Sequence, residues 1–393
     1  MSNIYLDNSA TTSVDTQVLD AMLPYFSNKF GNASSVHSFG QEARAAIDNA
    51  RYKIAEFLNC KSTEIIFTSG GSESDNLAIK GILEASEIEK PHIITSAFEH
   101  HAILETVKEL ESDEKIEATF IRPNCDGIIE IAEIEKAIKE NTILVSVMYV
   151  NNEIGTVQPI RAIGQMIEKR NKDRRQKMYF HTDAVQAAEY FDMNVDYLHV
   201  DLLTMTAHKI YGPKGVGLLY IRSGVPIKHQ IVGGGQEYKK RAGTENVASI
   251  VGFGKAVEII QKSKLKNQNY NSKLESLRDK LIDGLLQISN SFLNGSRKDR
   301  SPANANISFI NAEGEAILLN LDMEGIAVST GSACTSGSLE SSHVLISMGL
   351  KPERCHGSIR FTLGRSTTEE EIDKVLEVLP PIIEKLRKMS PFK

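Results

Sequence analysis

The sequence predicts an α/β protein with a large domain built on a mostly parallel β-sheet and a smaller α+β domain. From about residue 64 to residue 259, short runs rich in β-branched residues alternate with helical patterns, which is typical of parallel strands joined by crossover helices. A long polar helical pattern then interrupts this rhythm. The length of 393 residues also suits two domains, since domains usually hold about 100–200 residues.

The predicted elements follow in chain order. Strands are expected at 65–67, 92–95, 116–121, 143–147, 178–183, 201–206 and 216–221, and helices at 77–83, 102–110, 131–139 and 160–169. One long helix is expected over 263–288, followed by a mixed helical and strand-like pattern. We therefore predict a large domain over residues 14–259 and a small domain over residues 1–13 and 260–393.

Composition argues against several classes of function. The formal net charge of −6 gives no reason to expect a nucleic-acid partner. No apolar run approaches the roughly 20 residues of a membrane helix, and the first residues lack the pattern of a signal peptide. The four cysteines are scattered without a Cys-x-x-Cys pair, which argues against a disulfide framework or a zinc site. We expect a cytoplasmic protein with no metal and no membrane partner.

A polar turn between the first predicted strand and helix suits a phosphate. Gly71 and Ser72 lie within Thr68–Ser74, at the start of the helical pattern, where backbone N–H groups attract anions. The alternative is an ordinary strand-to-helix turn with a serine cap. The segment matches neither Walker A nor Gly-x-Gly-x-x-Gly.

Two further candidates follow strands at the carboxyl edge of the predicted sheet, where ligands bind in such folds. Asp183 ends one strand, with Gln186 soon after it; this aspartate can hold a cationic ring nitrogen or simply cap a helix. Lys209 lies just beyond the next apolar strand and can form a Schiff base with an aldehyde cofactor. Most lysines after a strand are solvated instead.

His100 and Arg360 extend this set. His100 follows a predicted strand, so its imidazole can stack on a flat ring or transfer protons, whereas a lone histidine is usually structural. Arg360 lies in the strand-like run Ser358–Arg365. Its guanidinium can bind a substrate carboxylate through two parallel hydrogen bonds, or it can form a surface ion pair.

Cys334 differs from the other cysteines in its surroundings. The segment 329–338 is dense in glycine and serine, a composition typical of a mobile loop that presents a thiol. A structural cysteine would lie on an apolar stretch, as Cys60 does beside Phe57 and Leu58. We predict a reactive thiolate at Cys334; a cationic group such as protonated His100 could lower its pKa, and the sequence does not show which group does so.

Taken together, these residues resemble the cysteine desulfurases of the NifS/IscS type, within the class V aminotransferase-like, fold-type I enzymes that use pyridoxal phosphate. The resemblance covers almost the whole chain. Its motifs are Tyr5–Thr12, Phe30–Asn32, Phe67–Gly70, Glu99-His100, Val150–Gly155, His208–Gly215 and Ser332–Ser336. Departures are small: Gly71-Ser72 replaces a common Ala-Thr, and Ala33 replaces a common proline.

The resemblance implies a site for pyridoxal 5'-phosphate completed by a homodimer. Groups around the ring would be Lys209 as the Schiff base, Asp183 on the pyridine nitrogen, Gln186 on the phenolic oxygen and His100 stacked on the ring. Groups around the phosphate would be Gly71, Ser72, Thr206, His208 and, from a second subunit, Thr244. Substrate-binding groups would be Asn32, Asn152 and Arg360, with Asn152 also near the cofactor. Asn151 precedes Asn152, and the sequence leaves open which of them faces the cofactor.

The activity implied is conversion of L-cysteine to L-alanine, with the sulfur passing to Cys334 as a persulfide. Cys334, Lys209 and His100 would be the catalytic residues, and a sulfur-acceptor protein such as an iron–sulfur scaffold would be the partner. One alternative is another activity of the same family, such as a selenocysteine lyase or an aminotransferase. Another is a non-catalytic sulfur-assembly subunit. The acceptor, and the choice between iron–sulfur and tRNA-thiolation routes, are not determined by the sequence.

Overall fold

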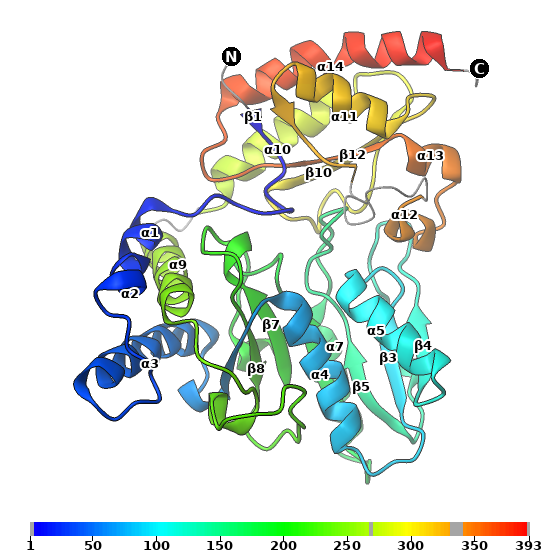
Figure 1. Cartoon of the computed structure of the whole chain (residues 1–393). Coiled ribbons are helices and arrows are strands. Elements are labelled where there is room, and N and C mark those ends of the chain that lie inside the picture. The colour runs from blue at the N-terminus through cyan, green and yellow to red at the C-terminus, as the bar shows by residue number, and fades with distance from the viewer. Residues whose placement is uncertain (1–3, 267–269, 331–340, 391–393) are drawn as a thin grey trace.

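Two lobes make up the chain, each around its own apolar interior. The computed structural model describes residues 4–266, 270–330 and 341–390. Cys334, the predicted nucleophile, lies outside the described residues. Figure 1 shows the lobe with the large sheet below a smaller lobe that contains both the first strand and the C-terminal helix.

The large lobe is built on a seven-stranded sheet in the order β2-β8-β7-β6-β5-β3-β4. Its strands are β2 Ile65–Thr68, β3 His92–Ser96, β4 Glu117–Ile121, β5 Thr142–Ser146, β6 Tyr179–Asp183, β7 Leu202–Thr206 and β8 Gly217–Ile221. Strand β8 runs antiparallel to both of its neighbours, and the remaining pairs are parallel. The predicted mostly parallel sheet is confirmed.

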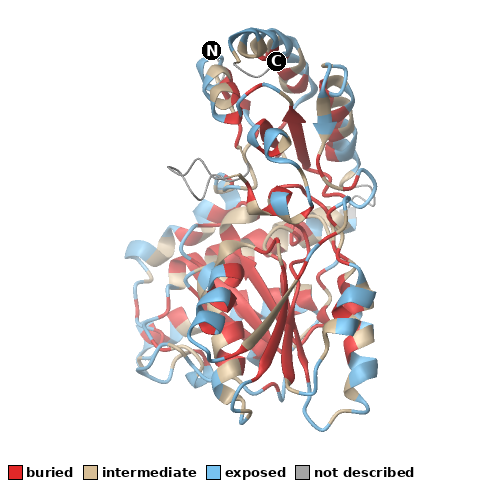
Figure 2. Ribbon diagram, turned by 90° about the vertical axis from the view of Figure 1, so that its right-hand side faces the viewer, coloured by how far each residue is buried: buried red, intermediate tan, exposed pale blue. Residues whose placement is uncertain are grey.

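Helices cover both faces of this sheet because successive strand residues point to opposite sides. Leu202 packs with helices α4 (Gly71–Ala85) and α5 (His101–Ser112), whereas Leu203 belongs to the interior on the other face. That second face is covered by α1 Thr16–Met22, α3 Ser38–Leu58, α7 Ile160–Asn171 and α9 Val247–Lys266. Figure 2 shows the strands as the most continuously buried part of the lobe.

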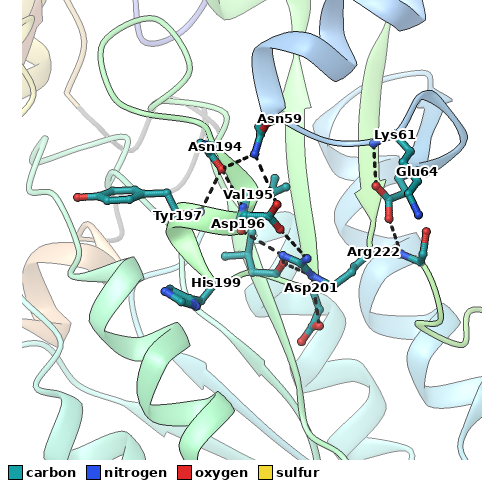
Figure 3. Close-up of polar contacts among 12 residues, drawn as sticks. Asn59, Lys61, Glu64, Asn194, Val195, Asp196, Tyr197, His199, Asp201 and Arg222 are labelled. Atoms are coloured by element: carbon teal, nitrogen blue, oxygen red, sulfur yellow. Dashed lines mark hydrogen bonds and ion pairs between the residues drawn. The ribbon is translucent and has the colours of Figure 1, made fainter.

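Short elements join these layers: α2 Pro24–Ser27, η1 Ser62–Glu64, α6 Ile131–Ala137, α8 Val195–Leu198, η2 Ala207–Lys209 and η3 Glu237–Lys239. A polar network lies at the edge of the sheet where β7 begins and β8 ends (Figure 3). In it, Arg222 pairs with Asp196 at 2.8 Å, and Asp201 accepts a hydrogen bond from the backbone N–H of Phe180 at 3.0 Å. This edge of the sheet is therefore held by its own polar contacts.

The small lobe contains two further sheets. Strands β1 (Ile4–Tyr5) and β11 (Ile326–Ala327) pair in parallel, and an antiparallel sheet has the order β12-β10-β9. The latter is formed by β9 Ser291–Leu293, β10 Asn304–Phe309 and β12 Ser358–Thr362. The helices of the small lobe are α10 Ser272–Leu285, α11 Gly314–Met323 and α14 Glu369–Met389, whereas α12 His343–Ser347 and α13 Pro352–His356 contribute buried residues to the interior of the large lobe. The α+β character predicted for this lobe is confirmed, whereas the exact domain limits stay a prediction.

The prediction of one helix over 263–288 is wrong. Tyr270 and Asn271 form a turn between α9 and α10. The Tyr270 hydroxyl donates to Glu189, and Asn271 Nδ2 donates to the carbonyl oxygen of Tyr190 at 3.0 Å. These contacts hold the turn to the large lobe. No glycine or proline in the sequence marks this turn. The helical run ends there because of contacts with residues that are distant in the sequence.

Arg365 provides a polar link between the lobes. Its Nε and Nη2 donate to the two carboxylate oxygens of Glu189 at 2.7 and 2.8 Å, and the Glu189 side chain is 2% exposed. We expect Arg365→Ala to lower the free energy of unfolding by about 3 kcal/mol, because it leaves a buried carboxylate without its cation. Urea unfolding monitored by circular dichroism measures this loss.

The double variant Glu189→Gln/Arg365→Met is the control. It removes both charges together, so it should lose clearly less stability than Arg365→Ala. Equal losses in the two proteins would show that packing of the arginine, and not its charge, stabilises the contact.

Candidate active site

A cavity of about 310 Å³ lies between the lobes at the carboxyl ends of β6 and β7. Most of the predicted site residues line it. They come from α4, from the ends of β6 and β7, from the segments that follow β3, β5, β6 and β7, and from β12. They are Gly71, Ser72, His100, Asn152, Asp183, Gln186, Thr206, His208, Lys209 and Arg360.

Three predicted residues are not brought into this cavity by the described part of the chain. Asn32 and Thr244 are exposed and do not line it. Thr244 lies instead in a separate depression with Ser69 and Arg241. Cys334 lies outside the described residues.

The Lys209 amine is held at the cavity by the N-terminal segment. Its Nζ donates to the carbonyl oxygen of Ala10 at 2.7 Å and also to that of Ser9. Gln186 Nε2 donates to the same Ser9 oxygen at 3.0 Å. The backbone N–H of Ser9 in turn donates to Thr362 Oγ1 at 2.9 Å. The segment therefore connects β12 of the small lobe with the residues that follow β6 and β7.

Two carboxyl groups line the cavity beneath this amine. Asp183 ends β6, is buried, and accepts a hydrogen bond from the backbone N–H of Val185 at 2.9 Å. Asp75, on α4, is also buried and lines the cavity. Burial raises the pKa of both groups; the charge of Asp183 adds to the shift at Asp75, while the Lys209 ammonium lowers the pKa of Asp183. Such a pair favours a cation between the lobes.

Glu99 is a third buried acid near this pair. Ser96 donates its hydroxyl to Oε1 of Glu99, and the backbone N–H of Met148 donates to the same oxygen at 2.9 Å. Burial raises the pKa of Glu99 to about 8 despite these donors, and the charge of Asp183 adds to the shift. Glu99 therefore carries a proton at neutral pH.

His100 is a neutral imidazole at neutral pH, and so it is not the cationic neighbour considered as one possibility for Cys334. It caps the N-terminus of α5, and its Nδ1 accepts a hydrogen bond from the backbone N–H of Ala102 at 3.1 Å. Burial lowers its pKa to about 4, and the neighbouring Lys209 ammonium adds to the shift. The ring proton therefore sits on Nε2, and the group cannot serve as a cation for the Cys334 thiolate.

An anion cradle lies at the start of α4. Gly71 and Ser72 occupy its first turn, where backbone N–H groups have no partner within the helix. A Cβ atom at position 71 would approach Cγ2 of Val185 to 3.3 Å, so a glycine keeps this turn open. The Thr206 hydroxyl and the His208 imidazole line the same cavity. Backbone donors, hydroxyl groups and an imidazole together suit a phosphate.

Arg360 is fixed on β12 with its guanidinium at the cavity. Nη1 donates to the carbonyl oxygen of Asn152 at 3.0 Å, and Nη2 pairs with Asp7 at 2.8 Å. Asn151 is committed elsewhere: its Nδ2 donates to the carbonyl oxygen of Phe98 at 2.9 Å, and its Oδ1 accepts from two backbone N–H groups. Asn152, and not Asn151, therefore lines the cavity beside Arg360.

Sequence reasoning missed several residues of this site, above all Asp75, Asp7 and the carbonyl groups of Ser9 and Ala10. Asp75 had a signal, because it follows Ser72 by three positions on a predicted helix and so lies on the same helical face. The carbonyl groups had none, since every residue carries one.

Comparison with known proteins places this site in a family. The model of the aminotransferase class-V family matches residues 4–375. A protein of Clostridium botulinum (strain Hall) named cysteine desulfurase IscS is 51% identical over 99% of this chain and 96% of its own length. Among solved structures, a NifS-like protein superimposes with a TM-score of 0.88 at 36% identity over 99% of both chains. A structure of SspA in complex with cysteine matches with a TM-score of 0.80 at 35% identity, over 92% of this chain and 99% of that chain.

The chain belongs to the aminotransferase class-V family and, within it, to the NifS/IscS-like cysteine desulfurases. Cysteine desulfurases of this family use pyridoxal phosphate. The residues present fit that group: an amine for its aldehyde, buried acids for its ring nitrogen and an anion cradle for its phosphate. No helix among the described residues is long and apolar enough to span a membrane.

We expect Glu99→Gln to stabilise the cofactor-free protein increasingly as pH rises from 5 to 8. Over this range the unfolded glutamate is already largely ionised while the folded one keeps its proton, so folding takes up a proton and the wild type loses stability as pH rises, which the glutamine variant does not. The difference should reach up to about 4 kcal/mol at pH 8, since one pKa unit corresponds to about 1.4 kcal/mol. Urea unfolding at both pH values measures it; a difference that does not change with pH would contradict the raised pKa.

Proposed function

We propose that the cavity around Lys209 binds pyridoxal phosphate, and that the chain uses it to convert L-cysteine to L-alanine and a protein-bound persulfide. The chain is a cysteine desulfurase that depends on this cofactor. The observation that carries the assignment of the site is that an amine, Lys209, and a buried carboxylate, Asp183, line one cavity at the ends of neighbouring parallel strands. The similar SspA structure is a complex with cysteine, which supports L-cysteine as the substrate here.

When bound, pyridoxal phosphate supplies an aldehyde for an amino group and a ring that takes up electrons from the substrate α-carbon. Lys209 would hold the aldehyde carbon until substrate arrives, and its Nζ would then accept the α-proton. Asp183 would keep the ring nitrogen protonated. Gln186 would hold the phenolic oxygen, and neutral His100 would stack on the ring.

The remaining residues would position phosphate and substrate. Gly71, Ser72, Thr206 and His208 would bind the phosphate in the cradle at the start of α4. Arg360 would bind the substrate carboxylate, because its guanidinium is fixed by Asp7 and by the Asn152 carbonyl with N–H groups to spare. The side chain of Asn152 would contact the same end of the substrate.

Cys334 would take the sulfur. Its thiolate would attack the sulfur of L-cysteine, the bond between that sulfur and Cβ would break, and Cβ would gain a proton, which leaves L-alanine and a Cys334 persulfide. The persulfide would then pass to the thiol of an acceptor protein, for which we favour an iron–sulfur scaffold. We place the reaction in the cytoplasm, where thiols are kept reduced. Selenocysteine lyase activity is the second candidate, because the same cavity would bind both amino acids.

A homodimer would explain why Asn32 and Thr244 do not line the cavity of their own subunit. Both residues are exposed. Near Asn32 in the sequence, the exposed rings of Phe30 and Phe39 lie 5.7 Å apart and form an apolar patch; Phe30 is 68% exposed, and Val36, in the same segment, is 88% exposed. Apolar patches on the surface commonly mark protein interfaces. A second subunit packed there would bring Thr244 to its neighbour's phosphate.

We expect the purified protein to be a dimer, with a mass of twice 43.4 kDa, and Val36→Asp to make it monomeric because a charge would be buried at the interface. Light scattering after size exclusion measures the mass, and absorbance near the cofactor band measures retention of pyridoxal phosphate, which should fall with the dimer. The control is Leu319→Glu, at an exposed apolar position on α11. A wild-type monomer with full cofactor retention would contradict the shared site.

We expect Cys334→Ala to reduce formation of L-alanine from L-cysteine at least about 100-fold while binding of pyridoxal phosphate is unchanged, since the nucleophile is lost but the cofactor contacts remain. Alanine and sulfide are measured by chromatography and by a colorimetric assay. Cys125→Ala, at an exposed cysteine, is the control and should be fully active. Retention of activity with selenocysteine alone in Cys334→Ala would favour the lyase, and retention with L-cysteine would exclude Cys334 as the nucleophile.

A further inference from the structure

The floor of the cavity contains one more acid than the assigned roles require. Asp183 and Glu99 each accept hydrogen bonds from backbone N–H groups. Asp75 is only 1% exposed; its side chain has a hydrogen bond with Thr204, but its Oδ1, like Oε2 of Glu99, has no hydrogen-bond partner among the described residues. Asp75 lines the cavity, whereas Glu99 does not. An unpartnered, buried carboxylate oxygen at a binding cavity requires an explanation.

The neighbours of Asp75 do not supply a positive charge. The basic side chain beside Asp75 is that of His181, whose Nε2 lies 3.7 Å from Oδ1 of Asp75. Burial lowers the pKa of His181 to about 3, so its ring is neutral at physiological pH. Its two nitrogens are already within hydrogen-bond distance of the hydroxyl groups of Ser146 and Thr204, at 2.9 and 3.1 Å. Within the described chain, no lysine or arginine pairs with Asp75.

This arrangement lowers the stability of the protein when no cofactor is bound. Burial and the charge of Asp183 raise the pKa of Asp75 well above its ordinary value, so without a cation this carboxyl group must take up a proton in order to be buried. An asparagine would have the same shape at position 75 and no charge. Proteins are commonly less stable than they could be at functional sites, where a bound ligand supplies the missing partner.

We propose that Asp75 is a positioning residue for the cofactor, whose negative charge acts with that of Asp183 to hold the protonated ring nitrogen. The inference deepens the proposed function and rests on it. Asp75 acts on the ring nitrogen by its electric field and through the hydrogen-bonded side chains of His181 and Thr204. Asp183 makes the direct contact with the ring nitrogen. The bound cation then balances two carboxylates, and the cost of burying Asp75 is offset only in the loaded protein.

The test compares Asp75→Asn with the wild type, each first freed of cofactor and then titrated with pyridoxal phosphate. We expect the cofactor-free variant to melt at a temperature at least about 2 °C higher, because an asparagine is buried without the proton uptake that the carboxyl group of Asp75 requires. We expect its dissociation constant for pyridoxal phosphate to rise about tenfold, because one of two charges facing the ring nitrogen is lost. The absorbance maximum of the loaded variant should shift, since the ring nitrogen is held less firmly in its protonated form.

Two further variants separate the outcomes. Asp201→Asn is a matched control: Asp201 is also buried but is already paired, with Lys177 at 3.3 Å and the Phe180 N–H at 3.0 Å. This variant should melt lower when cofactor-free and bind pyridoxal phosphate as the wild type does. If Asp75→Asn behaves in that same way, Asp75 is structural and the inference is overturned. If Asp183→Asn binds the cofactor as tightly as the wild type, the proposed function itself fails.

Discussion

The parallel pairing of β6 with β7 is the constraint on which the site depends. Their register sets Asp183 opposite Thr204, so the ends of the two strands lie side by side and Lys209 follows immediately beyond β7. The first turn of α4 and the N-terminus of α5 lie at the same edge, because each helix follows a strand of the same direction. The opposite edge has a polar network of its own (Figure 3) and contributes nothing to the cavity.

The large lobe alone would leave this edge open, and the small lobe completes it. Arg360 reaches the cavity from β12, and its ion pair with Asp7 ties it to the N-terminal segment. That segment passes from β1 in the small lobe to Ser9 and Ala10, whose carbonyl groups receive the Lys209 amine. Contacts between residues some two hundred or more positions apart in the chain therefore place the Lys209 amine and the Arg360 guanidinium at the same cavity.

Basic and acidic groups do not balance one another in the cavity. Its histidines, His100 and His208, are held neutral chiefly by burial, whereas its floor holds more carboxyl groups than it can pair internally. This imbalance suits a ligand that brings its own cation near the floor and its own anion near the start of α4. The protein thus gives up stability when empty in exchange for tighter binding when loaded.

The sequence by itself determined the α/β alternation, the strand limits to within a few residues, and the candidate roles of residues such as Asp183, Lys209 and His100. These follow from local periodicity and from position at a strand end, which are properties of short segments. Only the tertiary structure decided which of Asn151 and Asn152 lines the cavity, that His100 is neutral, that the chain turns at Tyr270, and that Asp75 faces the same space as Asp183. Each of these depends on burial or on contacts between distant segments, and such contacts exist only after the chain has folded.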